Sequence, residues 1–209
     1  MFCYVSESSE DKSIQLPKPF HKSTISVEEA LSLRRSVRSY TDKPVTLEEV
    51  SQLLWAAQGI NDERGLRTAP SGGALYPLET YVVAGNVTGL SSGLYRYIPQ
   101  DHRLIEVKKG DIREGLSAAS LGQNCVRSAP VSFVFSSVWQ RITKKYGERG
   151  KRYAIIEVGH AAQNIYLQAV SLNLGTVVVG AFSDDDVKKL IGMENGEDPL
   201  YVMPVGRKQ

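Results

Sequence analysis

The segment "RYAIIEVGHAAQNIYLQAVSLNLG", from residue 152 to about residue 173, most constrains how this chain can fold. Its length and its apolar residues predict a long helix that is apolar on most of its sides. A surface helix carries a single apolar stripe, so we expect this helix in the core or at a subunit interface. Glu157, His160 and Asn164 fall at positions i, i+3 and i+7 of one face, where they would line such an interface.

Capping signals predict the starts of the other helices. Ser26 and Glu29 form one S-x-x-E box, which predicts a helix through about Arg34. Thr46 and Glu49 form a second box before "LEEVSQLLWAAQG", whose apolar residues have helical spacing. Two more helices are expected, one opened by Asp111 and Glu114 and one capped by Ser183.

The expected strands are short and lie between these helices. They are residues 80–85, a hairpin over 93–110 with its turn near Asp101, and residues 129–137, 176–182 and 199–206. Helices and strands are interspersed without strict βαβ alternation, and 209 residues suit one domain with or without an extension. The pattern therefore favours an α+β fold over a doubly wound sheet.

Charge and composition exclude several classes of function. The net charge is +2 and the basic residues are scattered, which argues against nucleic acid as a partner. No apolar stretch resembles a secretory signal or reaches the roughly 18 residues of a membrane span, so we expect a cytoplasmic protein. Cys3 and Cys125 are then expected as reduced thiols, and His21, His102 and His160 are too dispersed for a metal site.

The stretch "RRSVRSY" places Arg34, Arg35 and Arg38 within five positions at the predicted end of a helix. If the chain then runs extended, Ser36, Arg38 and Tyr40 would project to one face, because side chains alternate along a strand. Guanidinium and hydroxyl groups together suit a phosphate monoester. The alternative is a solvated basic patch that favours the helix dipole.

Four segments of the chain, in order, carry a resemblance to a known family: "RRSVRSYTDKPV", "APSGGALYPLE", "LGTVVVGAF" and "PVGR". Together they resemble the FMN-dependent nitroreductase family, and the second segment has the form seen in its SagB-type dehydrogenase branch. The common nucleotide-binding and hydrolase motifs are absent. The resemblance implies a nitroreductase-like fold over 26–209, with a central mostly antiparallel sheet flanked by helices, and an intertwined homodimer. Residues 1–25 lie outside the resemblance, and their polar composition with Pro17 and Pro19 predicts an N-terminal arm.

The resemblance also implies where FMN is held, at the interface of the two subunits. Arg34, Arg35 and Ser36 would take the phosphate end, and Arg38 would lie nearer the ring, where a cation stabilises the reduced flavin. Arg207 matches a basic residue that also reaches the phosphate. A solvated C-terminal tail is the alternative for Arg207.

Pro70, Ser71, Gly72 and Gly73 would pack on the flavin from the partner subunit, and Leu75 would lie beside the ring. Glycine suits the close approach of backbone to a flat ring. An ordinary surface turn is the alternative reading of these residues.

Two further segments match flavin contacts of the family. Val179 and Gly180 match the place where a backbone N–H points at flavin N5, although a glycine at a strand bend is the alternative. Gln123 and Asn124 match a polar position that touches flavin or substrate, and a cap at a helix end is an equal reading.

The activity implied is reduction of nitroaromatics, quinones or related small molecules by NAD(P)H, through flavin N5 with ping-pong kinetics. An alternative is a SagB-type dehydrogenase or oxidase of a modified peptide or small molecule, with Lys145 and Tyr146 as base and acid. These two residues also fit a solvated basic loop. A protein that binds flavin without turnover, and a structural protein with a basic patch, remain as readings outside enzymology.

Overall fold

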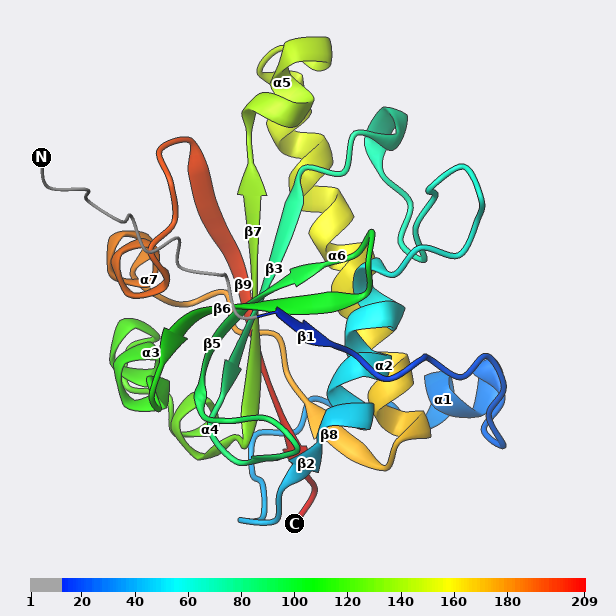
Figure 1. The fold of residues 1–209 in the computed structure, drawn as a ribbon, viewed down its shortest axis with the longest axis vertical. Helices are drawn as coiled ribbons and strands as arrows, with labels where there is room; N and C mark the ends of the chain where they lie inside the picture. Colours follow the sequence, from blue (N-terminus) through cyan, green and yellow to red (C-terminus); the bar gives the residue numbers. More distant parts are fainter. Residues whose placement is uncertain (1–12) are drawn as a thin grey trace, which may run out of the picture.

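The computed structural model describes residues 13–209, which form one seven-stranded sheet with helices on both faces (Figure 1). The strand order is β1-β6-β5-β3-β7-β9-β8, and every neighbouring pair is antiparallel. The strands are β1 (Ser13–Gln15), β3 (Leu78–Ala84), β5 (Gly93–Ile98), β6 (Arg103–Lys109), β7 (Val131–Val138), β8 (Leu174–Thr176) and β9 (Glu197–Arg207). A separate parallel pair joins β2 (Val45–Thr46) to β4 (Val87–Thr88).

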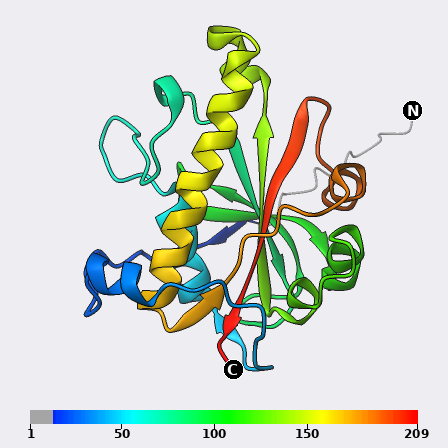
Figure 2. The same ribbon diagram turned by 180° about the vertical axis from the view of Figure 1, so that it is seen from behind.

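The helices divide between the two faces of the sheet (Figures 1 and 2). They are α1 (Val27–Leu33), α2 (Leu47–Gln58), α3 (Arg113–Ala119), α4 (Asn124–Ser128), α5 (Gln140–Tyr146), α6 (Arg149–Ser171) and α7 (Asp184–Ile191). Helices α2 and α6 cover one face, whereas α3, α4 and α7 cover the other. The predicted α+β class, with a mostly antiparallel central sheet flanked by helices, is confirmed.

Helix α6 is both a core helix and an exposed one. Val158, Ala161 and Ile165 are buried against the sheet and α2. On another side of the same helix, Ile155 is 54% exposed and Ile156 is 50% exposed. Large apolar side chains at that exposure mark an interaction surface when they are contiguous. No helix within residues 13–209 combines the length and apolarity that crossing a membrane requires.

Three of the predicted helix starts are confirmed in atomic detail, whereas the helix expected to open at Asp111 begins at Arg113 without a capping side chain. The side chain of Ser26 accepts a hydrogen bond from the backbone N–H of Glu29, 3.1 Å away. Thr46 and Glu49 form the complete reciprocal capping box of α2, each side chain accepting from the other residue's backbone N–H. At the start of α7 the side chain of Ser183 accepts from the backbone N–H of Asp186, as Ser26 does from Glu29. Such caps contribute roughly 1 kcal/mol each, which is enough to fix where a short helix begins.

Two elements differ from the sequence expectation. The strand expected over 176–182 occupies Leu174–Thr176 instead, and the rest is irregular backbone in which Val179 forms an isolated bridge to Val202. Helix α5 was not expected, and Lys145 and Tyr146, for which a solvated basic loop was the alternative reading, lie at its end. Neither α5 nor the short α4 carries a capping side chain, so the sequence offered no start signal for them.

The N-terminal segment from residue 13 packs on the rest of the domain. Strand β1 pairs with β6, and Leu16 is 3% exposed. Further along, the side-chain amide of Gln52 exchanges hydrogen bonds with both backbone groups of Phe20. Residues 1–12, which include Cys3, lie outside the described residues, and the arm predicted for 1–25 stays a prediction. From residue 13 onward the segment is a strand and a strap over α2.

Candidate functional site

The stretch from Arg34 to Tyr40, called the arginine segment below, follows helix α1 and runs beside β8. Ser36 bridges to Thr176, and the backbone N–H of Val37 donates to the carbonyl of Thr176 at 2.9 Å. The guanidinium of Arg34 lies 5.2 Å from the centre of the Tyr166 ring. The Ser36 hydroxyl is 3.3 Å from the Tyr166 hydroxyl. Tyr166, on α6, therefore holds both the first arginine and the serine in place.

The positive charge of this segment is not neutralised within the part of the chain described. Across residues 13–209, no carboxylate lies within 4.0 Å of the side chains of Arg34, Arg35 or Arg38. Arg35 donates only to the backbone carbonyls of Ser32 and Arg34. Three clustered cations repel each other, so an anionic ligand would be stabilised here.

Tyr40 does not share this exposed surface, and that part of the sequence prediction is wrong. Its side chain is 6% exposed and its hydroxyl donates to the carbonyls of Val37 and Pro204. Burial raises the pKa of Tyr40 well above its ordinary value. Between the isolated bridges of Ser36 and Tyr40 the chain does not continue as a regular strand, so the alternation argument fails.

The loop from Pro70 to Tyr76 is held in a strained shape. Gly73 has φ +65°, and Ala74 and Tyr76 also have positive φ, at +53° and +47°. Residues with a Cβ adopt this region at a cost of roughly 1 kcal/mol each. The hydroxyl of Ser71 fastens the loop, because it accepts from the N–H of Tyr76 at 2.9 Å and donates to Glu157 at 2.6 Å.

Glu157 is the buried anchor of this loop. It lies on α6 and is 2% exposed, so it does not line an exposed interface as its spacing suggested. One carboxylate oxygen accepts from Ser71, while the other has no hydrogen-bond partner in the described chain. Burial raises the pKa of Glu157 to about 7, against the opposing effects of Ser71 and Arg67. The carboxyl group therefore titrates near neutral pH.

The end of helix α5 lies directly over the same loop. A Cβ added at Gly73 would sit 2.6 Å from the Tyr146 hydroxyl and 3.0 Å from the Lys145 ammonium. The two residues singled out from the sequence as a base and acid pair are thus brought together with Gly73. Only glycine leaves room for these two polar groups beside the loop.

The remaining predicted residues are distributed around the sheet edge. The N–H of Val179 donates to Val202 at 2.8 Å, and Gly180 is exposed beside Tyr201. Gln123 donates to the carbonyls of Ser120 and Ala181, which ties the start of α4 to the segment after Gly180. Three of the predicted residues make no interaction that fixes a role: Pro70 and Asn124, which are exposed, and Leu75, which is half-buried.

Arg207 is engaged elsewhere in the structure. Its guanidinium forms two contacts with the carboxylate of Glu49, at 2.7 and 2.8 Å. Glu49 is also the capping residue of α2. This bidentate pair fastens the end of β9 to the start of α2, and Arg207 is therefore not a free cation like those of the arginine segment.

The arginine segment and the 70–76 loop lie on opposite sides of α6. The loop contacts Glu157, whereas the arginine segment contacts Tyr166, nine residues later. Nine residues are two and a half helical turns, which is about 14 Å of rise and a rotation of roughly 180°. Helix α6 itself thus separates the two parts of the predicted site within one chain.

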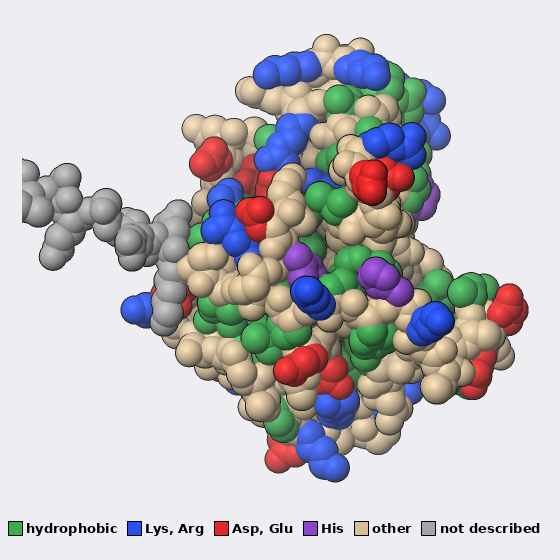
Figure 3. All heavy atoms as spheres, turned by 45° about the vertical axis from the view of Figure 1, so that its right-hand side comes forward, with side chains coloured by type: hydrophobic (Ala, Val, Ile, Leu, Met, Phe, Trp, Pro, Cys, Tyr) green, Lys and Arg blue, Asp and Glu red, His purple; other side chains and the backbone are tan. Residues whose placement is uncertain are grey.

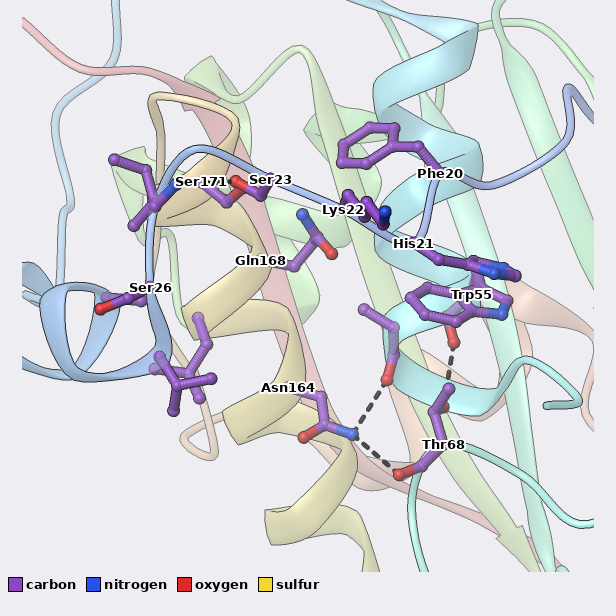
Figure 4. Close-up of a pocket in the computed structure, with 15 residues that line it drawn as sticks. Phe20, His21, Lys22, Ser23, Ser26, Trp55, Thr68, Asn164, Gln168 and Ser171 are labelled. Atoms are coloured by element: carbon purple, nitrogen blue, oxygen red, sulfur yellow. Dashed lines mark hydrogen bonds between the residues drawn. The ribbon is translucent and has the colours of Figure 1, made fainter.

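A cavity of about 300 Å³ lies between the strap of residues 20–27, α2 and α6 (Figure 4). His21 stacks on Trp55 at its edge, with the ring centres 5.1 Å apart. Asn164 donates to the carbonyls of Ala56 and Thr68, so it links α6 to α2 and to the approach to Pro70. The cavity contains none of the predicted flavin residues.

Comparison with known proteins identifies the class. The sequence model of the Nitroreductase family matches residues 31–207, and the chain belongs to this family. A Methanocaldococcus jannaschii protein that bears the name nitroreductase is 46% identical over 184 residues, covering 88% of this chain and 92% of that one. A crystal structure of a Ralstonia eutropha protein of the same designation is 31% identical, with a TM-score of 0.84, covering 97% of this chain and 91% of that one.

A third relative is the microcin B17-processing protein McbC of Escherichia coli. It is 27% identical over 199 residues, covering 90% of this chain and 73% of that protein. The family match indicates a flavin-type oxidoreductase with the nitroreductase-like fold.

The residues present fit a flavin nucleotide. A phosphate suits the cluster of unneutralised arginines with Ser36. Beside the loop, Gly73 has no side chain of its own, and the Tyr146 hydroxyl and the Lys145 ammonium lie next to it. Tyr166 was not identified from the sequence, because its position along the helix forms no recognisable pattern. Glu157 was assigned to the lining of an interface, whereas the residue is buried. A lone carboxylate within the apolar run "AIIEVGHAA" was the available signal for a buried polar contact.

Proposed function

We propose that the protein is an FMN-dependent NAD(P)H oxidoreductase that reduces nitroaromatic, quinone or related small acceptors. The observation that carries the proposal is the arginine segment, which is fixed by Tyr166 and lacks carboxylate partners among residues 13–209. Membership of the Nitroreductase family supports it.

The chain's own residues take separate roles in this proposal. Arg34, Arg35 and Ser36 bind the phosphate, and Arg38 stabilises negative charge near the ring. FMN, when bound, supplies two-electron hydride chemistry that no side chain provides. The loop at Gly73 positions and desolvates the ring face.

The proposal includes a homodimer. Because α6 separates the arginine segment from the 70–76 loop, one cofactor that touches both needs one part from each of two chains. The exposed Ile155 and Ile156, which directly precede Glu157 on α6, support contact with a second copy. In this arrangement the arginine segment of one subunit faces the loop of its partner.

The first test is the visible spectrum of the purified protein, recorded before and after anaerobic addition of NADH or NADPH. The proposal expects a yellow protein, or one that takes up FMN, with flavin absorbance that bleaches on reduction. A protein that binds FMN but is not bleached by either nucleotide would instead be a non-catalytic flavin binder or use another reductant. A protein that takes up no FMN overturns the proposal.

A second candidate, a dehydrogenase of a modified peptide or small molecule, is favoured by the position of Lys145 and Tyr146. Both side chains reach the edge of Gly73, where a base and an acid beside the flavin would be needed. The similarity to McbC supports this alternative.

The two candidates make different predictions for the double variant Lys145→Met/Tyr146→Phe. If the protein is a quinone or nitroaromatic reductase, NAD(P)H:quinone activity should stay within about threefold of wild type. A loss of several orders of magnitude would favour the dehydrogenase. Lys144→Met is the matched control, since Lys144 lies one residue away on the same exposed helix end.

A further inference from the structure

A second cavity, of about 420 Å³, opens beside the 70–76 loop. Leu75 and Tyr76 of the loop line it directly, so it adjoins the proposed reaction centre. The other walls come from the ends of β3 and β5, the turn at 98–100 and Arg141 of α5. Its size is within the usual range for a small-molecule site.

The lining of this cavity carries an excess of positive charge. Arg67, Arg96 and Arg141 line it, and Glu79 is its one acidic residue. Arg141 pairs with Glu79. This pair leaves two guanidinium groups in the lining without a carboxylate partner among residues 13–209.

Arg67 is the group that most needs a counter-charge. It is half-buried, and its contacts are the amide oxygen of Gln58 at 2.8 Å and the face of the Tyr76 ring, 4.4 Å from its centre. Burial lowers its pKa, although an arginine stays charged in a protein. Glu79 and Glu157 act on its charge from farther away, but its hydrogen-bond and ring partners are neutral. A partly desolvated cation of this kind is stabilised by an anion brought within hydrogen-bonding distance.

The surroundings of the cavity would also attract anions. Residues 140–152, which span α5 and the start of α6, carry six basic residues and one acidic residue. Basic side chains predominate at that end of the molecule in the space-filling view (Figure 3). A surface of one sign concentrates ligands of the opposite sign near a cleft.

We propose that the cavity lined by Arg67, Arg96 and Arg141 is an anion subsite, which binds a carboxylate or phosphate group of a molecule reacting at the adjacent loop. The inference rests on the proposed function and gives it a substrate class: the site prefers a reactant that carries an anionic group. That group belongs either to the acceptor or to the phosphates of the nicotinamide nucleotide, and the experiment distinguishes the two.

The acceptor is tested with two compounds of matched shape, 4-nitrobenzoate and its neutral methyl ester, on the FMN-loaded enzyme. The measured quantity is the ratio of kcat/KM for the acid to kcat/KM for the ester. Arg141→Gln removes a cation and leaves Glu79 unpaired, so the ratio should fall at least tenfold. Glu79→Gln removes the anion and should raise the ratio. Arg64→Gln is the control, because Arg64 forms an exposed pair with Asp62 outside the cavity.

The nucleotide is tested in the reductive half-reaction, with the dissociation constants of NADPH and NADH measured by anaerobic stopped-flow. If the cavity binds a nucleotide phosphate, Arg96→Gln and Arg141→Gln should raise these constants about tenfold, with no matching change in the acceptor ratio. Arg67→Lys adds a variant that keeps the charge beside Gln58 but loses the fork geometry, and it should give a smaller effect of the same kind.

The inference is overturned if neither the acceptor ratio nor the nucleotide constants differ between Arg141→Gln, Arg96→Gln and the Arg64→Gln control. The experiments distinguish failure of the anion-subsite inference from failure of the proposed function. Wild-type protein that binds FMN and is bleached by NAD(P)H keeps the oxidoreductase proposal, whatever the anion results. Direct titration of FMN-loaded protein with 4-nitrobenzoate by calorimetry gives a binding readout that needs no turnover.

Discussion

The arginine segment and the 70–76 loop contribute to the proposed flavin site in opposite ways. The segment is exposed and charged, and it is held by few contacts, mainly with Tyr166 and β8. The loop carries no charge of its own but is strained and fastened to a buried carboxylate. One part therefore supplies electrostatic attraction, and the other supplies shape.

This difference predicts that changes in the two parts have different consequences. Removing charge from the segment should weaken ligand binding with little effect on the free energy of unfolding. Altering the loop should affect both, because its shape depends on packing that the unfolded chain lacks. The following variants test that separation.

The largest effect is expected for Arg34→Gln/Arg35→Gln. Each charge-assisted hydrogen bond to a phosphate contributes roughly 1.5–3 kcal/mol, so the Kd for FMN should rise at least about 100-fold. Riboflavin, which lacks the phosphate, should lose much less affinity. Quenching of flavin fluorescence measures both, and Arg103→Gln, at an exposed pair with Asp101, is the control. Equal losses for FMN and riboflavin would contradict the phosphate assignment.

Gly73→Ala should be next in size. The new methyl group meets the Tyr146 hydroxyl at 2.6 Å, in addition to the cost of a positive φ. Gly192→Ala has a similar backbone, φ +77°, but nothing within 4 Å of the added Cβ. We expect a loss of about 1 kcal/mol for Gly192→Ala and a somewhat larger loss for Gly73→Ala, measured by urea unfolding, because the Tyr146 hydroxyl and the Lys145 ammonium are the ends of flexible side chains that must move. Equal losses of unfolding free energy would show that the side chains at the end of α5 move away from the added methyl group at no measurable cost.

Glu157→Gln tests the buried anchor through pH. Because the folded-state pKa, about 7, lies above the ordinary value of 4.5, the folded protein binds more protons between these limits. Stability should therefore be greatest below about pH 4.5 and decline as pH rises toward 7, by roughly 1–3 kcal/mol from this group. In Glu157→Gln that decline should be absent, whereas Glu114→Gln, at an exposed residue, should keep it. The check is the free energy of unfolding measured across pH 4.5–8.

The same contrast explains how much of the site the sequence could predict. Clustered arginines are visible in seven residues, although their role stays a prediction. Caps such as Ser26 and Thr46 act over three residues, and these were predicted correctly. The contact between Ser71 and Glu157 joins residues 86 positions apart, and no local pattern encodes it. Gly73 was named by resemblance, but its need for space follows only from the position of α5.

Tyr40 and Arg207 show a further limit of sequence reasoning. Each residue type fits the predicted role, yet Tyr40 turns into the core and Arg207 meets Glu49. A short segment cannot show which of its polar groups will find a partner within the fold. The exposed and unpaired arginines are distinguished from the paired one only by tertiary contacts.

Arg207→Gln should have the smallest effect on FMN affinity. It most directly compares a paired arginine with the unneutralised arginines of the arginine segment. In the structure this guanidinium is already paired, with the two side chains 28% and 15% exposed, so its loss should cost about 1 kcal/mol of stability. The Kd for FMN should change less than threefold, since binding phosphate would require breaking the pair with Glu49. An increase as large as that of Arg34→Gln/Arg35→Gln would mean that Arg207 leaves Glu49 when the ligand binds. Glu49→Gln would then tighten FMN binding by freeing the guanidinium, and the double variant with Arg207→Gln would lose that gain.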